Sequence, residues 1–492
     1  MNNAQQDARS HVVPKWLEYS QAIKKGDLTI TRRNAFEPNK ATKECLQNDL
    51  LEFYETPTSE LACRLMGAGI VIGDKQLARD MATFLQKKGG VDSLSLKLAD
   101  RVLDESDSYP VLAIDERITT LRQWVSKYPK SPVSWIELSR AFTIKGKDFK
   151  AERAALVALQ LAPYDRYIVR CAVRLFLHLG KFELAHYYIK RAVKQHFDPW
   201  LKATEINVAL IAQQQTPEFK RFIPHDPTLN ELFHYSELIE SAAYLELTSG
   251  NEKRAKKQFR LAWRNPSDNV ITHAEWLLRN KIPSLRGEVE IAFERSHEAA
   301  TWVNYAELNV NKALDAAREW ELEEPYSKYP FTVGSGIACN AGRPLLGADI
   351  AKRGLLSNIH DKAIYNNLCY SLLRAGQFEE ANKYIARLRK EADTDLFCKA
   401  TLGLYEFKNK NILLGRGTYL DVIEQLRQQD APDLLGKAFL NLALAELEAR
   451  TSSAIEIASD ALSITEAIKG PDIILFRQLV IDKLEGVRKP IL

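Results

Sequence analysis

The chain has 492 residues, too many for one compact core of ordinary size, so several domains or an elongated array are expected. Its formal net charge of +4 is small for this length and excludes a general affinity of the whole molecule for polyanions. The sequence holds no run of about 18 apolar residues, so we expect no membrane-spanning helix and no membrane partner.

Residues 1–50 predict an irregular N-terminal lead-in, which includes the polar stretch "KKGDLTITRRNAFEPNK". This lead-in lacks the apolar run of a signal peptide. The six cysteines are scattered, without a Cys-x-x-Cys pair or a histidine at zinc-ligand spacing. We therefore expect reduced thiols, no metal site and a cytoplasmic location.

After the lead-in, one short phrase recurs in which a glycine stands five positions before an alanine. A glycine just past a helix can adopt the left-handed conformation that closes a turn, and a small residue soon after it lets two helices approach closely. The phrase therefore predicts repeated helical hairpins. Its copies are Gly73 and Ala78, Gly146 and Ala151, Gly180 and Ala185, Gly250 and Ala255, and Gly376 and Ala381.

The clearest hairpin covers residues 132–163. Trp135, Leu138 and Phe142 share one face of a first helix, with Ser139 expected to face Ala151 of the second helix. A shift of 34 residues reproduces the pattern. With this interval, the segment resembles the tetratricopeptide repeat (TPR) family, whose unit has that length and carries large, small and aromatic residues in the same order.

The resemblance implies an all-α, TPR-like fold: a right-handed superhelix, or α-solenoid, of stacked helical hairpins that share one long core. First helices then line a concave groove. We expect divergent helical repeats over 51–130, a TPR-like array over 131–266, drifted repeats over 267–327, and a C-terminal TPR-like array with a capping helix over 328–492.

A basic stripe is expected on the groove wall, because positions one repeat apart on first helices point the same way. Between residues 131 and 200 the basic residues exceed the acidic ones by six. Arginine clusters favour carboxylates and phosphates, although a solvated helix face with ion pairs to Glu137 or Asp165 is an equal alternative. The candidate partner-binding residues of this stripe are Arg140, Arg166, Tyr167, Arg170, Arg174 and His178.

Asn366 and Asn367 are further candidate partner-binding residues, on the first helix of a later repeat. They resemble the asparagines with which some TPR domains hold a C-terminal carboxylate. The neighbouring repeats offer Val333 and Thr401 at the place of Asn367, so the set is incomplete and we do not predict such a clamp.

Motifs of catalysis and cofactor binding are not found, neither a phosphate loop nor a nucleophile or metalloprotease signature, so we expect no cofactor and no catalytic residue. Arg353 and His360 have a spacing that resembles the signature of HEPN-type ribonucleases. The repeat places Arg353 at the end of a second helix and His360 in the turn after it, so we favour a chance spacing.

These features favour a non-enzymatic adaptor or scaffold that binds an acidic or extended segment of a partner protein in its groove, as a subunit of a multi-protein complex. The alternatives are a nucleic-acid-binding helical-repeat protein that uses the same basic stripe, and the HEPN-like ribonuclease. Steep weakening of binding by salt would distinguish the nucleic-acid alternative.

Overall fold

The computed structural model describes residues 11–25, 40–72, 75–91, 93–103, 114–195, 197–216, 218, 227–288 and 290–488. These residues form α-helices, short 3-10 turns and loops, with no β-strand among them. The chain divides into two compact units, one of Thr29–Arg117 and one of Met1–Leu28 with Ile118–Leu492. The expected all-α fold of stacked helical hairpins is confirmed, and none of the described helices is long and apolar enough to cross a bilayer.

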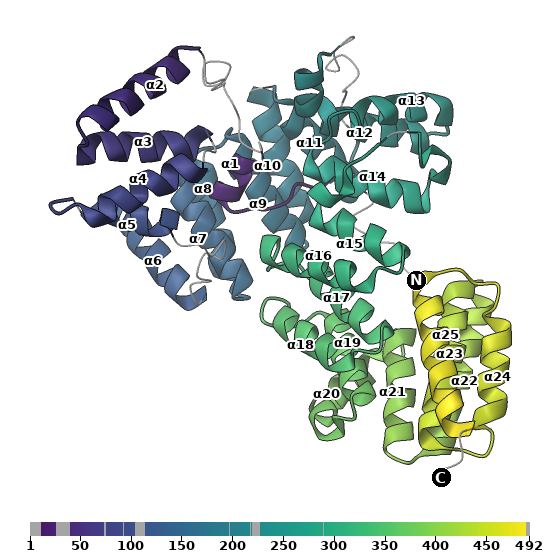
Figure 1. Ribbon diagram of the computed structural model, residues 1–492. Helices are drawn as coiled ribbons and strands as arrows, with labels where there is room; N and C mark the ends of the chain where they lie inside the picture. The colour runs from purple at the N-terminus through teal and green to yellow at the C-terminus, as the bar shows by residue number, and fades with distance from the viewer. Residues whose placement is uncertain are drawn as a thin grey trace. The chain divides into compact units, whose positions relative to one another are not determined.

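The smaller unit contains four helices (Figure 1): α2 (Lys40–Glu55), α3 (Ser59–Ile72), α4 (Lys75–Lys87) and α5 (Ser93–Leu103). Their apolar faces meet in a core that includes Phe53, Leu65 and Leu85. Gly73, expected in the turn between α3 and α4, lies outside the described residues.

The larger unit contains α1 and the long helical array (Figure 1). Its helices are α1 (Tyr19–Lys24), α6 (Ile114–Lys127), α7 (Pro132–Ile144), α8 (Asp148–Leu161), α9 (Arg166–His178), α10 (Phe182–Gln195), α11 (Pro199–Ile211), α12 (Leu229–Thr248), α13 (Glu252–Ala262), α14 (Asp268–Asn280), α15 (His297–Ala306), α16 (Val310–Glu323), α17 (Tyr329–Asn340), α18 (Pro344–Leu355), α19 (Lys362–Arg374), α20 (Phe378–Glu391), α21 (Leu396–Lys408), α22 (Ile412–Gln428), α23 (Pro432–Ala449), α24 (Ala454–Ile464) and α25 (Pro471–Arg488). The segment expected to be an irregular lead-in thus includes α1 and the start of α2.

The hairpin turns have the predicted chemistry. Gly146, Gly180, Gly250 and Gly376 all have a φ between 64° and 83°, the left-handed region that favours glycine. The close helix approach is also confirmed, because the buried Ser139 hydroxyl donates to the carbonyl oxygen of Ala151 at 2.7 Å. The recurring phrase therefore marks the turn of these four hairpins and, at Ala151, a close contact between the two helices.

Two features of the structure explain why the repeat interval is lost over residues 267–327. After α14, two 3-10 turns, η3 (Pro283–Leu285) and η4 (Phe293–Arg295), stand where the repeat would place a second helix. The next hairpin, α15 and α16, turns at Leu308, which has a φ of 62° without being glycine. Because Leu308 lies 34 residues before Gly342, the regular interval resumes there, but the turn cannot be recognised by a glycine.

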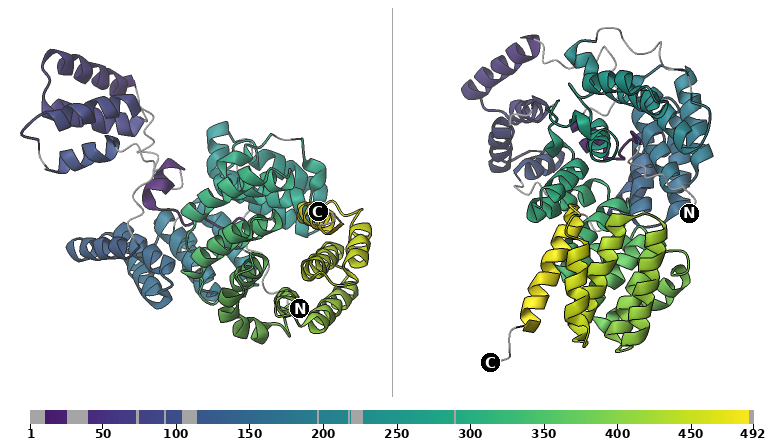
Figure 2. Two further views of the ribbon diagram at one scale, coloured as in Figure 1. Left: turned by 60° about the horizontal axis from the view of Figure 1, so that its bottom comes forward. Right: turned by 90° about the vertical axis from the view of Figure 1, so that its right-hand side faces the viewer.

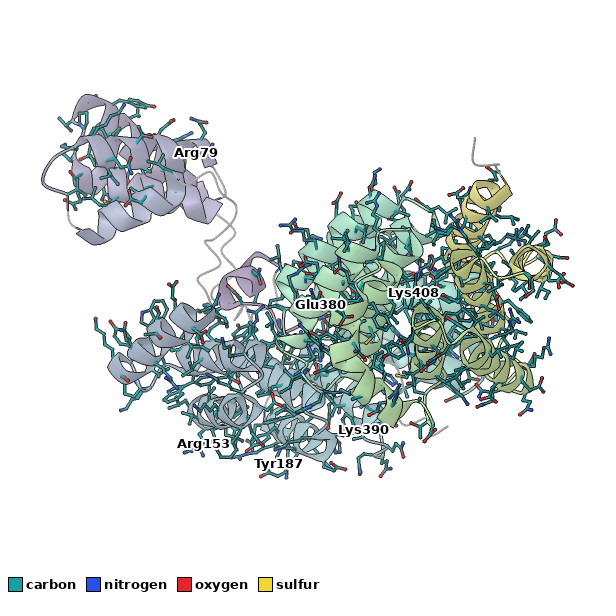
Figure 3. All side chains as sticks on the ribbon, turned by 90° about the horizontal axis from the view of Figure 1, so that it is seen from below. Arg79, Arg153, Tyr187, Glu380, Lys390 and Lys408 are labelled. Atoms are coloured by element: carbon teal, nitrogen blue, oxygen red, sulfur yellow. The ribbon has the colours of Figure 1, made fainter. Side chains whose placement is uncertain are left out.

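The outer helices carry much of the exposed surface. Arg153 on α8 and Tyr187 on α10, both labelled in Figure 3, lie on the second helices of their hairpins and are exposed. The first helices are buried over more of their circumference: in α9, the eleven residues from Arg166 to Phe176 are all buried. A helix buried all round must be covered on the groove side as well.

Candidate functional site

The cover on the groove side of the first helices is the chain's own N-terminal segment, residues 11–25. This segment crosses the inner faces of α7, α9, α11, α12 and α14, which we call the N-terminal groove. Figure 1 shows it as the purple ribbon that leads into α1 beside α9. Two groove asparagines accept main-chain N–H groups from it: Asn207 accepts from Val12 and Asn269 from Lys15, each at 3.2 Å.

Other groove side chains contact the main chain further along the segment. The Arg140 Nε donates to the carbonyl oxygen of Trp16 at 3.1 Å, and the Tyr167 hydroxyl donates to that of Leu17 at 3.0 Å. The N–H of Trp16 donates to the hydroxyl oxygen of Tyr326 at 3.1 Å. The groove therefore pairs with both donors and acceptors of an extended backbone.

The side chains of the segment fill two kinds of subsite. Trp16 is fully buried and packs against the ring of Tyr326 at a centroid distance of 5.4 Å. The ammonium of Lys15 lies 3.5 Å from the Glu323 carboxylate and donates to the Ser296 hydroxyl at 3.3 Å. The aromatic slot that holds Trp16 thus lies next to an acidic basin that holds the Lys15 ammonium.

His11 lies at the other end of the segment, buried edge-on against Tyr244 of α12. Burial, with a smaller effect of the nearby His273 on α14, lowers the pKa of His11 to about 4, so its imidazole is neutral at physiological pH. His273 itself hydrogen-bonds to Glu240. Neither ring nitrogen of His11, nor the Trp16 Nε1, has a hydrogen-bond partner among the described residues.

The arginines of the basic stripe lie on the groove-lining helices α7 and α9, but they are buried rather than presented to solvent. Arg140, Arg166, Arg170 and Arg174 are only 2 to 8% exposed. Each is paired inside the fold: Arg140 with Glu18 at 3.1 Å, Arg166 with Asp198 at 2.5 Å, Arg170 with Glu237 at 2.9 Å and Arg174 with Glu324 at 3.5 Å. The nucleic-acid alternative therefore loses the surface on which it depended.

Of the other two members of the stripe, Tyr167 is buried and His178 is half-buried. Tyr167 contacts the segment as described above, and its single hydroxyl proton is shared with the Glu137 carboxylate, which lies 2.8 Å from the hydroxyl oxygen. Burial and the neighbouring Arg174 lower the pKa of His178 to about 4. Sequence reasoning missed Trp200, which lies between Arg166 and Arg170, with its ring 4.9 and 4.6 Å from their guanidinium carbons.

The second site is a pocket of 310 Å³ on the concave side of the C-terminal helices, which we call the C-terminal pocket. Its lining comes from α17, α19, α21, α22, α23 and α25, and the left view of Figure 2 shows the green and yellow helices following one another around an arc. Apolar walls are formed by residues such as Phe397 and Leu434, which are 54% and 37% exposed. This volume is at the low end for ligand sites.

The last helix, α25, contacts helices of earlier repeats. The Asp472 carboxylate of α25 accepts from Lys437 at 2.6 Å, from Asn340 at 2.9 Å and from the hydroxyl of Tyr305. Burial raises the pKa of Asp472, but Lys437 and the hydrogen bonds outweigh it and hold the pKa below its usual value. Asp472 therefore ties α25 to α15, α17 and α23, beside the pocket.

The candidate residues Asn366 and Asn367 both line the C-terminal pocket. Asn366 accepts from the Thr401 hydroxyl at 2.7 Å, and Asn367 donates to the carbonyl oxygen of Thr332 at 3.0 Å. Sequence reasoning did not find Lys437, because only the curvature of the array brings it to the same pocket.

Arg353 and His360 do not form a paired site. Arg353 lies near the end of α18 and donates to Glu321 at 2.8 Å, while the exposed His360 lies in the turn before α19, as the repeat predicts. Burial raises the pKa of Asp148, and the charge of the nearby His360 only partly offsets this effect.

The fold and these two sites define a helical-repeat protein whose N-terminal groove holds its own segment and whose C-terminal helices form a pocket. The sequence matches no protein-family model, and no curated protein matches it. Solved structures that are similar in fold include yeast Tom70 (12% identity, 76% of this chain and 93% of that chain, TM-score 0.27) and human IFIT1 as a dimer with PPP-AAAA (12%, 89% and 93%, TM-score 0.27). A structure of Naa15/Naa10 bound to HypK-THB is also similar (11%, 88% and 94%, TM-score 0.23). Likenesses this distant do not assign a partner.

Proposed function

We propose that the chain is a non-enzymatic cytoplasmic adaptor that holds an extended segment of a partner protein in the C-terminal pocket, as a subunit of a multi-protein complex. The observation that carries this proposal is the pocket itself, in which exposed large apolar side chains surround a few polar groups. Such a combination is typical of sites that bind a side chain and fix the backbone next to it.

The polar groups of the pocket favour a partner that presents oxygen atoms. The Asn366 Nδ2 can donate to a main-chain carbonyl, and the Lys437 ammonium adds a positive group that Asp472 partly neutralises. Phe397 and Leu434 offer the contact surface for one large apolar side chain of the partner. With so few anchors, we expect a Kd on the order of micromolar.

The 34-residue interval and the left-handed turn glycines support a further proposal, that the repeats are divergent members of the tetratricopeptide repeat family. The unit length alone does not identify a partner, since one fold serves many functions.

Affinity purification from native cells, with nuclease present, tests the adaptor function. Phe397→Glu places a charge in the C-terminal pocket, and Phe149→Glu is the matched control because Phe149 is 69% exposed on α8. We expect a stoichiometric partner protein that is lost with Phe397→Glu and retained with Phe149→Glu.

Retention of every partner by the Phe397→Glu protein would contradict the proposed site. A partner that disappears on nuclease treatment of the wild-type protein would contradict the adaptor function and favour nucleic-acid binding.

A further inference from the structure

The N-terminal groove has the properties of a ligand site and already contains its ligand. We infer that this groove recognises extended segments of partner proteins in which a basic residue precedes a large aromatic or apolar residue. The N-terminal segment is then a resident, exchangeable ligand that the same chain supplies.

The main-chain contacts are the first argument. The segment from His11 to Glu18 adds no helix to the array, and groove side chains hold its backbone instead. Asn207 and Asn269 accept N–H groups, while Arg140 and Tyr167 donate to carbonyl oxygens. Bonds to the backbone do not depend on the side chains of the bound segment, so another extended chain can form them.

The side-chain subsites give the chemistry of the ligand. Burial would lower the pKa of Lys15, but the nearby carboxylates, Glu323 and Asp268 above all, outweigh it and raise this pKa, so the basin favours a cation. The adjacent slot buries Trp16 completely against the Tyr326 ring. A basic residue followed by a large ring therefore fits this pair of subsites.

The resident segment is an imperfect ligand, which makes exchange possible. Both ring nitrogens of His11 and the Trp16 Nε1 are buried without a partner among the described residues. Each such group weakens binding by on the order of tenfold. The covalent link to the array raises the effective concentration of the resident segment, so a free competitor must make better contacts to displace it. A partner segment with apolar atoms at these two places avoids the penalty.

A labelled peptide with the sequence of residues 11–25 tests the inference by fluorescence anisotropy on the full-length protein. Trp16→Ala should weaken the resident segment and admit the peptide, with a Kd at least about tenfold lower than for the wild type. Trp124→Ala is the matched control, because Trp124 is 53% exposed on α6, and it should behave as the wild type. A peptide carrying Lys15→Glu should not bind.

Equal affinity of the Trp16→Ala and Trp124→Ala proteins for the peptide would overturn the inference, as would equal binding of the Lys15→Glu peptide. Dimeric wild-type protein that the peptide converts to monomer would also overturn it, because a second copy would then be the occupant. Phe397→Glu in the C-terminal pocket should leave peptide binding unchanged, so the two sites can fail independently.

Hydrogen exchange on the wild-type protein covers the case in which Trp16→Ala does not fold. An excess of peptide 11–25 carrying His11→Leu and Trp16→Phe should accelerate exchange of the Val12, Lys15 and Trp16 amides and leave α19–α23 unchanged. Unchanged exchange of these three amides at saturating peptide would overturn the inference.

Discussion

Replacing Arg140 by alanine should release the N-terminal segment from its groove. The guanidinium, 2% exposed, donates to the carbonyl oxygens of Trp16 and Glu323 at 3.1 and 2.8 Å. Only the bond to Trp16 holds the segment, because Glu323 belongs to the array itself. An unsatisfied buried acceptor costs about 1–3 kcal/mol, so loss of this bond should weaken docking by about 2 kcal/mol. The bond to Glu18 adds little, because that carboxylate is 22% exposed.

The Trp16 amide reports this loss in a native-state hydrogen-exchange experiment, because its N–H is held by Tyr326 only while the segment is docked. A cost of about 2 kcal/mol corresponds to roughly 30-fold faster exchange. Arg153→Ala is the control, since Arg153 is exposed on α8, and it should leave the rate unchanged.

The reasoning would be refuted by a folded Arg140→Ala protein in which the Trp16 amide exchanges within threefold of the wild-type rate. Equal acceleration in every helix of the array would also refute it, because global destabilisation, rather than release of the segment, would then explain the change.

Three further predictions follow from the described contacts. Burial lowers the pKa of His11 to about 4 in the docked segment, whereas the released imidazole titrates near 6.5. Docking should therefore be complete above about pH 6.5 and weaken as the pH falls toward 4. In the His11→Leu protein, exchange of the Trp16 amide should lose part of this pH dependence. Gly415→Ala should lower the free energy of unfolding in urea by about 1–3 kcal/mol, because its Cβ would lie 2.6 Å from the Phe407 ring. Gly417→Ala on the same helix is the control. Its Cβ would have no atom within 4 Å, so it should raise the free energy of unfolding by up to about 1 kcal/mol. Asp472→Ala should release α25 and speed its proteolysis, while Asp482→Ala, an exposed residue of the same helix, should not; equal proteolysis of the two variants would exclude a closing role for Asp472.

The hairpins could be predicted because their signals are local. Gly146 and Gly180 mark turns that need a positive φ, and Ser139 with Ala151 marks a close helix contact within one repeat. The turn at Leu308 was missed because it has the same conformation without the residue that signals it.

Of the two sites, the sequence could indicate some members but not their environment. Asn366 and Asn367 were found on a first helix, and they line the C-terminal pocket. The arginines of the stripe were also placed on groove-lining helices. Their burial was not foreseen, because a charge excess counted over residues 131–200 omits Glu237 and Glu324, which pair with Arg170 and Arg174.

The sequence by itself determined the all-α class, the helical hairpins and most of their turns, since spacings of three, four and 34 residues specify helix faces and repeats. Only the tertiary structure decided what the groove contains. Arg140 contacts Glu323 across 183 residues, and Trp16 contacts Tyr326 across 310. Such contacts depend on how many repeats curve round and how tightly, and this curvature is the sum of small packing angles that no local pattern of residues encodes.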